Sequence, residues 1–383
     1  MGLDINIQSI LENKSTIKSI DRNLVEDDFP IKYCGQVNWE GLGLTKSNDS
    51  LKSIFAIRKL FEDIPNLDKI DRLDRIFCLV RYIALSDIEK EYKESYETRF
   101  ESRLGQFFWE ELKSKGIQFD REHIVHIDNS CTSGNCVLGF AHQGIKLGMW
   151  ESCLVVTIDL VDYYNLLFLN GLGVLSNNSL DPQAASRPFD KNRNGFVKSD
   201  GAAAALVCNE TFAKRNSLTA KPIEILSFTQ SADAYRLTDG REDVESIVHA
   251  MQTALNLAQL KPEDICFVKA HGTGTKLNDE HEAKAIRKIF SNPMEPVPVL
   301  AMKGHLGHVT DASGLVETLI AGEAAQGGQI LPTKNCEEPE FEIDIVQKPR
   351  VITGKRYFMS NTVGFGGNNS TLIVRANGEN QNG

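Results

Sequence analysis

The sequence lacks the features that mark membrane, secreted and zinc-binding proteins. No apolar run among its 383 residues approaches the ~18 residues of a membrane span. Residues 1–5 carry neither the basic segment nor the long apolar segment of a secretion signal, so we expect a cytoplasmic protein. The eight cysteines form no Cys-x-x-Cys pair and no cysteine–histidine pattern with zinc spacing. We therefore expect reduced thiols and no bound metal.

Basic residues are too few for a general nucleic-acid binder. The chain has 42 Lys and Arg against 52 Asp and Glu, a formal net charge of −10. Phosphate contacts need clustered basic side chains. Hydrophobic residues at 41% and charged residues at 25% are ordinary for a folded globular chain. We expect neither nucleic acid nor a membrane among its partners.

Strand and helix patterns alternate in two sets, one early and one late in the chain. Residues 1–29 are polar, which predicts a loosely attached N-terminal extension, and residues 377–383 predict a disordered tail. The patterns predict helices at 51–64, 70–95, 131–149, 243–258, 279–290 and 311–326, and strands at 124–127, 153–158, 265–268, 297–301 and 357–360.

This alternation predicts an α/β fold with right-handed crossovers and a mostly parallel sheet. Because the order of elements returns late in the chain, we expect two duplicated halves, bounded at 30–210 and 211–376. Ligands in such folds bind beyond the carboxyl ends of the strands. The loops at those ends are therefore the place to look for chemistry.

Cys131 lies at the junction of a predicted strand and a predicted helix. The apolar run 124–127 leads through Asp128-Asn129-Ser130 into the cysteine, and a helix-length stretch with three glycines follows. The N–H groups of a first helical turn favour the thiolate, which is the reactive form of a thiol. Cysteine is also a common small core residue, so this segment alone leaves both interpretations open. Cys136, inside the predicted helix, lacks those N–H groups and is interpreted as packing.

Three later loops carry reactive or glycine-rich sequences at the same topological position. His271-Gly272-Thr273-Gly274-Thr275 follows the strand at 265–268, and Lys303-Gly304-His305-Leu306-Gly307-His308 follows the strand at 297–301. Gly364-Phe365-Gly366-Gly367-Asn368 follows the strand at 357–360. Each loop alone is weak evidence, since a lone histidine is more often a structural residue. Together with Cys131 they predict one active site.

These four segments, in this order, resemble those of the β-ketoacyl synthases, the condensing enzymes (ketosynthases) of the thiolase superfamily. The connecting segment 187–196 is also similar. The resemblance extends from about residue 124 to 375 and is poor before it. It implies the thiolase fold, with duplicated βαβ halves in a layered α-β-α-β-α arrangement.

The resemblance implies a role for each matching residue. Cys131 matches the nucleophile that accepts the acyl group, and a thiolate is both a nucleophile and a good leaving group. His271 and His308 match the two histidines whose N–H groups stabilise an enolate. Lys303 and Glu282 match a supporting charged pair. Glu282 also fits the acidic position of a helix cap, and the two roles are compatible.

Other positions concern the oxyanion hole and the substrate. Phe365 matches a gating aromatic residue, and the resemblance implies an oxyanion hole and gate at Cys131, Phe365 and Gly366. His305 and Asp311 depart from the family pattern, so we expect them to modulate the substrate. His305 could add a donor, bind a different substrate group or fill space, and Asp311 could act as a helix-terminal charge.

The implied reaction is a decarboxylative Claisen condensation of a cysteine-bound acyl group with a malonyl thioester on acyl carrier protein, in fatty acid or polyketide biosynthesis. No bound cofactor is implied, because the phosphopantetheine of the carrier delivers the substrates. We expect a homodimer, with a heterodimer containing a ketosynthase-like partner as the alternative. Charge alone suggests contacts for the acidic carrier at Arg58 and Lys59, or at Lys191 and Arg193.

Two alternative functions stay open. Altered loops could make the chain an acyltransferase that passes the acyl group to a non-malonyl nucleophile. The chain could also be a partner subunit of the chain-length-factor type, although such partners usually lack the nucleophile. The region before Cys131 is some tens of residues shorter than usual, and the strand ending at Asp159 lacks the usual Gly-Gly pair.

Overall fold

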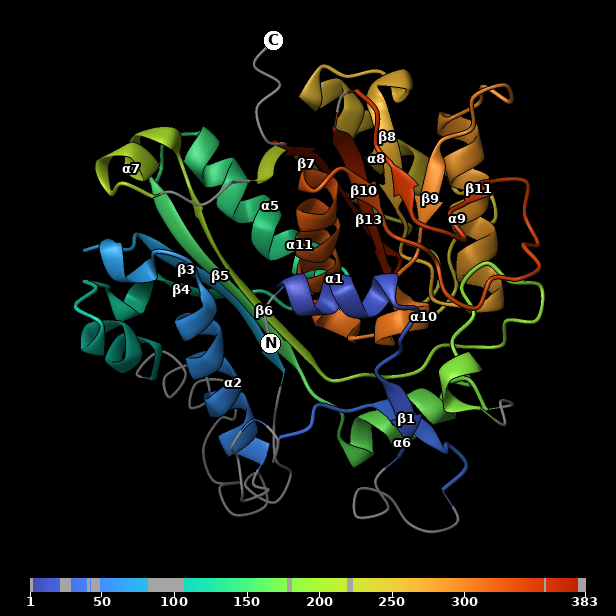
Figure 1. The fold of residues 1–383 in the computed structure, drawn as a ribbon, viewed down its shortest axis with the longest axis horizontal. Helices are drawn as coiled ribbons and strands as arrows, with labels where there is room; N and C mark the ends of the chain where they lie inside the picture. Colours follow the sequence, from blue (N-terminus) through green and yellow to red (C-terminus); the bar gives the residue numbers. More distant parts are fainter. Residues whose placement is uncertain are drawn as a thin grey trace.

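Most of the chain is placed in two sheets with helices between and outside them (Figure 1). The computed structural model describes residues 3–20, 29–39, 42, 49–81, 107–177, 181–218, 223–354 and 356–377. The helices are α1 (Leu3–Leu11), α2 (Asp49–Asp63), a helix over 107–114, α5 (Ser133–Lys146), α6 (Tyr163–Gly171), α7 (Glu210–Arg215), α8 (Glu245–Ala258), α9 (Lys276–Ile289), α10 (Lys303–Leu306) and α11 (Ser313–Gln326). The strands are β1 (Ile17–Ser19), β2 (Tyr33–Gly35), β3 (Arg75–Arg81), β4 (Ile124–His126), β5 (Ser152–Asp159), β6 (Gly201–Cys208), β7 (Ile223–Ala232), β8 (Ile265–Lys269), β9 (Pro298–Leu300), β10 (Gln329–Ile330), β11 (Asp344–Ile345), β12 (Arg350–Val351), β13 (Tyr357–Gly364) and β14 (Asn368–Ala376).

The two main sheets share one design. The first has the order β4-β3-β5-β6, and the second has the order β11-β9-β8-β13-β14-β7. In the first sheet β3 pairs parallel with β4 and β5, whereas β6 joins antiparallel. In the second sheet β11, β9, β8 and β13 run parallel, and β14 and β7 join antiparallel. The strands lie within 75–208 and 223–376 respectively; the boundary between two halves at 210 stays a prediction.

Five layers result, and the predicted thiolase-type arrangement is confirmed. Helices α5 and α11 lie between the sheets and contact strands of both. Helix α2 and the helix at 107–114 pack on the outer face of the first sheet, and α8 and α9 pack on the outer face of the second. At the centre α5 and α11 touch through glycines, since a Cβ added to Gly134 would lie 2.3 Å from the backbone nitrogen of Leu315. This contact sets the N-terminal ends of both helices side by side.

Most of the predicted elements are confirmed where the apolar pattern is strongest. The run Cys153–Ile158 is buried on both faces of β5, as expected of a strand inside a covered sheet. Helix α11 is buried around nearly its whole circumference, which explains why small and apolar residues fill it. No helix within the described ranges is both long and apolar enough to span a bilayer.

The helix predicted at 70–95 is wrong over its described part. Residues 75–81 form strand β3 instead, between β4 and β5. The five apolar residues from Ile76 to Val80 are all buried, so they satisfy both faces of a central strand. The charged residues around them suggested a mixed-charge helix, because a short apolar run does not by itself distinguish the two structures. Residues 82–95 lie outside the described ranges.

The prediction of a loosely attached N-terminal extension is wrong for residues 3–20. Helix α1 packs against α11, and Ile10 is only 1% exposed. Strand β1 pairs antiparallel with β2. The segment between α1 and β1 is bound to the loop before His308: the Thr16 N–H donates to the carbonyl of His305 at 2.8 Å. Residues 21–28 of this prediction lie outside the described part of the chain.

Replacing Ile10 with alanine should therefore lower the free energy of unfolding by about 2–5 kcal/mol, because it leaves a cavity between α1 and α11. Urea denaturation followed by circular dichroism measures the effect. Ile5 lies on the same helix but is 58% exposed, so Ile5→Ala should change stability by no more than about 0.5 kcal/mol. Equal effects of the two substitutions would show that α1 does not dock as described.

Candidate active site

Cys131 lines a pocket and lies just before helix α5, whose N-cap is Thr132. The side chain is 8% exposed, and the preceding Ser130 has a positive φ of 53°, a sharp turn between strand β4 and the helix. The end of β13 packs directly against this turn, since a Cβ added to Gly364 would lie 3.2 Å from the Cys131 nitrogen. The predicted strand-to-helix position of the thiol is thus present.

His271 and His308 meet Cys131 from the other half of the chain. The Cys131 sulfur and one ring nitrogen of each histidine lie within 4.8 Å of one another. The two imidazole rings cross at 78° with centroids 5.2 Å apart. His271 follows β8, and His308 follows α10. The structure therefore brings together the three residues that the sequence singled out.

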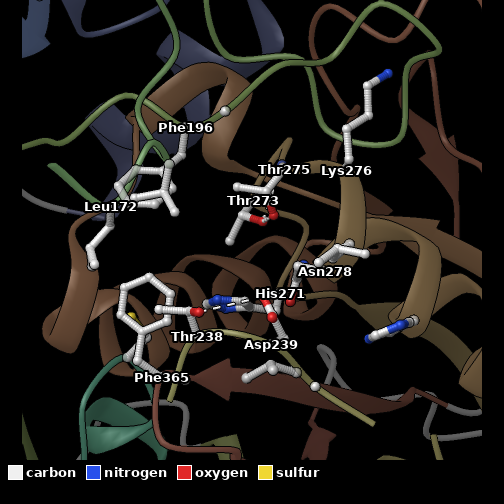
Figure 2. A pocket seen from close by; sticks show the side chains of 18 of the residues that line it. Leu172, Phe196, Thr238, Asp239, His271, Thr273, Thr275, Lys276, Asn278 and Phe365 are labelled. Atoms are coloured by element: carbon white, nitrogen blue, oxygen red, sulfur yellow. Dashed lines mark hydrogen bonds between the residues drawn. The ribbon is translucent and has the colours of Figure 1, made fainter. Parts of the chain in front are cut away.

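The pocket has a volume of about 340 Å³ and joins these three residues to the surface. Figure 2 shows Leu172 and Phe365 on one side of the His271 ring and Asn278 on the other. Thr273 and Thr275 from the loop after β8 also line it. An apolar wall opposite a wall of hydroxyls and amides suits a chain that carries both methylene and amide groups.

The ionisation of Cys131 differs from the expectation for a helix N-terminus. Burial is the main cause that raises its pKa to about 12, and the negative charge of Asp311 acts in the same direction. The hydrogen bond from Ser130 and the charge of Lys303 oppose this rise without cancelling it. The resting site thus holds a thiol, and the proton must leave during the reaction.

Both histidines are neutral in this environment. Burial lowers the pKa of His271 and of His308 well below the ordinary value of 6.5, and the charge of Lys303 adds to the effect. The Nδ1 atom of His271 lies 3.5 Å from the Lys303 ammonium, and that of His308 lies 3.0 Å from the Ser313 hydroxyl. In both rings Nε2 is the nitrogen left for the pocket.

A thiol and two imidazoles are also typical zinc ligands. Buried ammonium groups nearby, those of Lys303, Lys198 and Lys269, act on the two rings and oppose a bound cation. The absence of a metal accordingly stays our prediction.

The carboxylate that pairs with Lys303 is Glu317, and the predicted pair with Glu282 is wrong. The Lys303 ammonium donates to Glu317 Oε1 at 2.7 Å and to the His271 carbonyl at 2.6 Å. Lys269 donates to the other oxygen of Glu317 at 3.2 Å. Sequence reasoning missed Glu317, although one signal was available: it is one of only two charged residues in helix α11.

Glu282 has a different task. Its two oxygens accept the backbone N–H groups of His271 at 2.7 Å and Gly272 at 2.8 Å, which fixes the loop that carries the histidine. Burial raises the pKa of Glu282 to about 7, in opposition to these two bonds. Glu282 therefore acts on the site through the backbone, as a positioning residue.

Replacing Glu317 with glutamine should lower the free energy of unfolding by about 3–5 kcal/mol, because two buried lysines lose their shared carboxylate. Thermal and urea unfolding measure this. Glu210→Gln is the matched control, since Glu210 pairs with Lys214 on the exposed surface of α7, where such pairs contribute about 0.3–0.5 kcal/mol. A Glu317→Gln variant as stable as this control would contradict the ion-pair network.

The glycine loop after β13 contributes only part of what was expected. Phe365 is half-buried and lines the pocket, in agreement with a gate position. Gly366 is wrong as an oxyanion donor, because its N–H already donates to the Leu237 carbonyl at 2.7 Å. Its φ of 83° shows that the glycine is needed for the turn. Oxyanion donors at Cys131 and Phe365 stay a prediction.

His305 does not face the substrate pocket. Its Nδ1 lies 2.9 Å from the carbonyl of Lys14 and its Nε2 lies 3.1 Å from that of Pro332. Its own carbonyl accepts the Ser15 hydroxyl at 2.9 Å and the Thr16 N–H. Of the alternatives for His305, substrate binding is thus wrong, and the residue fastens the N-terminal segment to the loop of His308.

Asp311 does not line the pocket either. It is 1% exposed and lies in the short 3₁₀ turn Thr310–Ala312 that leads into α11, the position of a helix-terminal charge. Its N–H donates to Asp159 Oδ2 at 3.2 Å, and Asp159 also binds the Lys198 ammonium at 2.8 Å. Asp311 can influence the chemistry only through its charge near Cys131.

The basic residues suggested for a carrier contact are mostly engaged. Arg193 is 2% exposed and pairs with Glu340, so this suggestion is wrong. Arg58 and Lys59 pair with Glu111 and Glu62, and Lys191 pairs with Glu338 at the surface.

Comparisons with known proteins agree with the geometry. Residues 123–213 match the family description "Beta-ketoacyl synthase, N-terminal domain", and residues 223–337 match "Beta-ketoacyl synthase, C-terminal domain". The two ranges, 91 and 115 residues long, together make up just over half of the 383 residues.

Two curated relatives illustrate the similarity in sequence. The chain is 36% identical over 255 residues to 3-oxoacyl-[acyl-carrier-protein] synthase 2 of Coxiella burnetii, an alignment that covers 65% of this chain and 61% of the relative. It is 30% identical over 254 residues to the tetracenomycin polyketide synthase ketoacyl synthase alpha subunit of Streptomyces glaucescens, with 66% of this chain and 59% of the relative covered. The chain thus spans about three fifths of the length of these relatives.

Solved structures extend the similarity in fold to nearly the whole chain. A ketosynthase structure from a type II polyketide synthase, with its acyl-carrier protein and bound to the hexaketide, superimposes with a TM-score of 0.82 at 21% identity and covers 98% of this chain and 95% of that one. The ishigamide ketosynthase/chain length factor gives a TM-score of 0.80 at 22% identity, with the same coverage. At such identities the likeness concerns the fold alone.

Proposed function

This chain belongs to the β-ketoacyl synthase family, and from that premise we propose that it catalyses the decarboxylative condensation of a Cys131-bound acyl group with a malonyl thioester on acyl carrier protein. The observation that carries the proposal is the cluster of Cys131, His271 and His308, which line one pocket with their reactive atoms within 4.8 Å of one another.

In the first half-reaction the acyl group moves from the carrier thiol to Cys131. The sulfur of Cys131 attacks the thioester carbonyl, the bond to the carrier sulfur breaks, and the proton of Cys131 passes to the departing carrier thiolate. Because the pKa of Cys131 is raised to about 12, free thiolate is scarce before the carrier arrives. Direct transfer of the proton from Cys131 to the carrier sulfur during acyl transfer avoids the cost of first forming the free thiolate.

In the second half-reaction the malonyl carboxylate leaves as CO₂ and its electron pair forms an enolate. The Nε2–H groups of His271 and His308 donate to the enolate oxygen, where the negative charge develops. The enolate carbon then attacks the Cys131 thioester, and the Cys131 thiolate departs and takes a proton from water. Neither histidine is consumed, and no bound cofactor is needed.

Acyl loading followed by intact mass spectrometry tests this function. The wild type incubated with an acyl-loaded carrier protein should gain the mass of one acyl group, and Cys131→Ala should gain none. Cys208→Ala is the matched control, since Cys208 lies on β6 outside the pocket and should load normally. Equal labelling of Cys131→Ala and the wild type would refute the proposal.

The malonyl donor separates the condensation from its alternatives. Omission of the malonyl carrier should leave the acyl group on Cys131. Release of the acyl group to an amine or alcohol without that donor would favour an acyltransferase. Full activity of a heterodimer that contains Cys131→Ala would favour a partner subunit of the chain-length-factor type, against which the intact site residues argue.

The setting we propose is cytoplasmic, with acyl carrier protein as the partner and a homodimer as the assembly. Both substrates would arrive on the carrier's phosphopantetheine. The polar wall formed by Thr273 and Thr275 and the apolar wall at Leu172 and Phe365 support a channel for such an arm.

A further inference from the structure

Backbone hydrogen bonds and ring packing hold the His308 imidazole in place, but they do not determine which ring nitrogen carries the proton. The backbone N–H of His308 donates to the Val197 carbonyl at 2.6 Å, and the Ser199 N–H donates to the His308 carbonyl at 3.0 Å. The ring packs edge-on against Phe196, at 81° and 4.8 Å between centroids, and against His271. Packing fixes the plane of the ring. It does not decide which edge carries the nitrogens or which nitrogen carries the proton, because the edges of an imidazole have nearly the same shape.

Ser313 is placed to make that choice. Its hydroxyl oxygen lies 3.0 Å from Nδ1 of His308, and its side chain is fully buried as the first residue of α11. Within the described ranges this hydroxyl has no other hydrogen-bond partner. A buried hydroxyl proton needs an acceptor, and here the lone pair of Nδ1 is the one in reach. The hydroxyl therefore donates to Nδ1.

A neutral imidazole that accepts at Nδ1 carries its proton on Nε2. We propose that Ser313 is a positioning residue that makes Nε2 of His308 a hydrogen-bond donor toward the pocket, an inference that rests on the proposed condensation. Lys303 does the same for His271, since an ammonium group can only donate to the Nδ1 that lies 3.5 Å away. Two N–H groups then point at one developing oxyanion.

Without the Ser313 hydroxyl, neither the orientation of the His308 ring nor the position of its proton would be fixed. The ring could flip within the same frame, or the proton could move to Nδ1, and either change would turn a carbon or a lone pair toward the enolate oxygen. Only the step that builds the enolate needs the N–H. Acyl transfer to Cys131 should therefore be affected much less than decarboxylation.

Kinetics test this separation. Ser313→Ala should slow decarboxylation of the malonyl carrier about three- to tenfold, the net effect of one hydrogen bond, and leave the rate of acyl transfer to Cys131 within about twofold. In a His308→Ala background the same substitution should cause no further slowing, because its effect passes through the ring. Ser313→Thr keeps a hydroxyl and should keep most of the wild-type rate.

A spectroscopic readout makes the test independent of activity. In ¹⁵N-histidine-labelled protein, with the signals of His308 identified by their loss in His308→Ala, the wild type should show the Nε2–H tautomer and Ser313→Ala a mixture. An unchanged tautomer, equal slowing in the His308→Ala background, or equal loss of acyl transfer would overturn the proposal. A wild type that neither loads nor decarboxylates would refute the proposed function alone, since the tautomer would still report on Ser313.

Discussion

Replacing His308 with alanine is expected to slow malonyl decarboxylation about 100- to 1000-fold, the typical cost of one donor at a developing oxyanion. His308 is 1% exposed and neutral, and its Nε2 is the ring nitrogen free to face the pocket. Release of ¹⁴CO₂ from a labelled malonyl carrier measures the rate.

Acyl transfer provides the internal control for this substitution. Since Cys131 remains, His308→Ala should still accept an acyl group, detected by intact mass. His305→Ala is the matched variant: it removes a buried histidine three residues away that binds carbonyl groups of the N-terminal segment and of Pro332. It should lower stability while the decarboxylation rate of the folded protein changes little. A His308→Ala variant with the wild-type decarboxylation rate would rule out enolate stabilisation by this residue.

Alkylation of Cys131 by iodoacetamide is expected to accelerate about tenfold for each pH unit between pH 7 and pH 10, about 1000-fold in total. The thiolate is the reacting form, and burial raises the pKa of Cys131 to about 12, so its fraction grows throughout this range. The histidines stay neutral across it, because their pKa values lie well below 6.5.

Mass spectrometry of the peptide that contains Cys131 follows this rate separately from the other seven cysteines. A plateau near pH 8 would show that the helix N-terminus lowers the pKa of the thiol, as the sequence alone suggested, and that burial is not the dominant cause.

The catalytic loops were predictable because their signals are local. The loop after β8 combines two glycines of positive φ, Gly272 at 47° and Gly274 at 79°, with the reactive His271, and Gly307, with a φ of 71°, directly precedes His308. Such turns are encoded by a few adjacent residues. The buried strand β5 and helix α8 were predictable for the same reason, since their apolar pattern lies within one element.

The wrong predictions for Lys303 and His305 have a different cause: they depend on which residues meet in the folded chain. Lys303 binds Glu317 in helix α11 and not Glu282, whose carboxylate accepts backbone N–H groups of the His271 loop. His305 faces the carbonyl of Lys14, some 290 residues earlier in the chain. Spacing along the sequence carries no information about such contacts.

The attachment of residues 14–16 to the loop before His308 has a consequence for how the chain is made. Ser15 bonds to a carbonyl 290 residues further on. At a synthesis rate of about 5–20 residues per second, these first residues wait about 15 to 60 s before their partner exists. Residues 14–16 are thus synthesised well before the loop to which they bind, so these contacts form late in the synthesis of the described fold. Until the loop that carries Lys303 and His308 has been synthesised, the polar groups of this segment lack these partners.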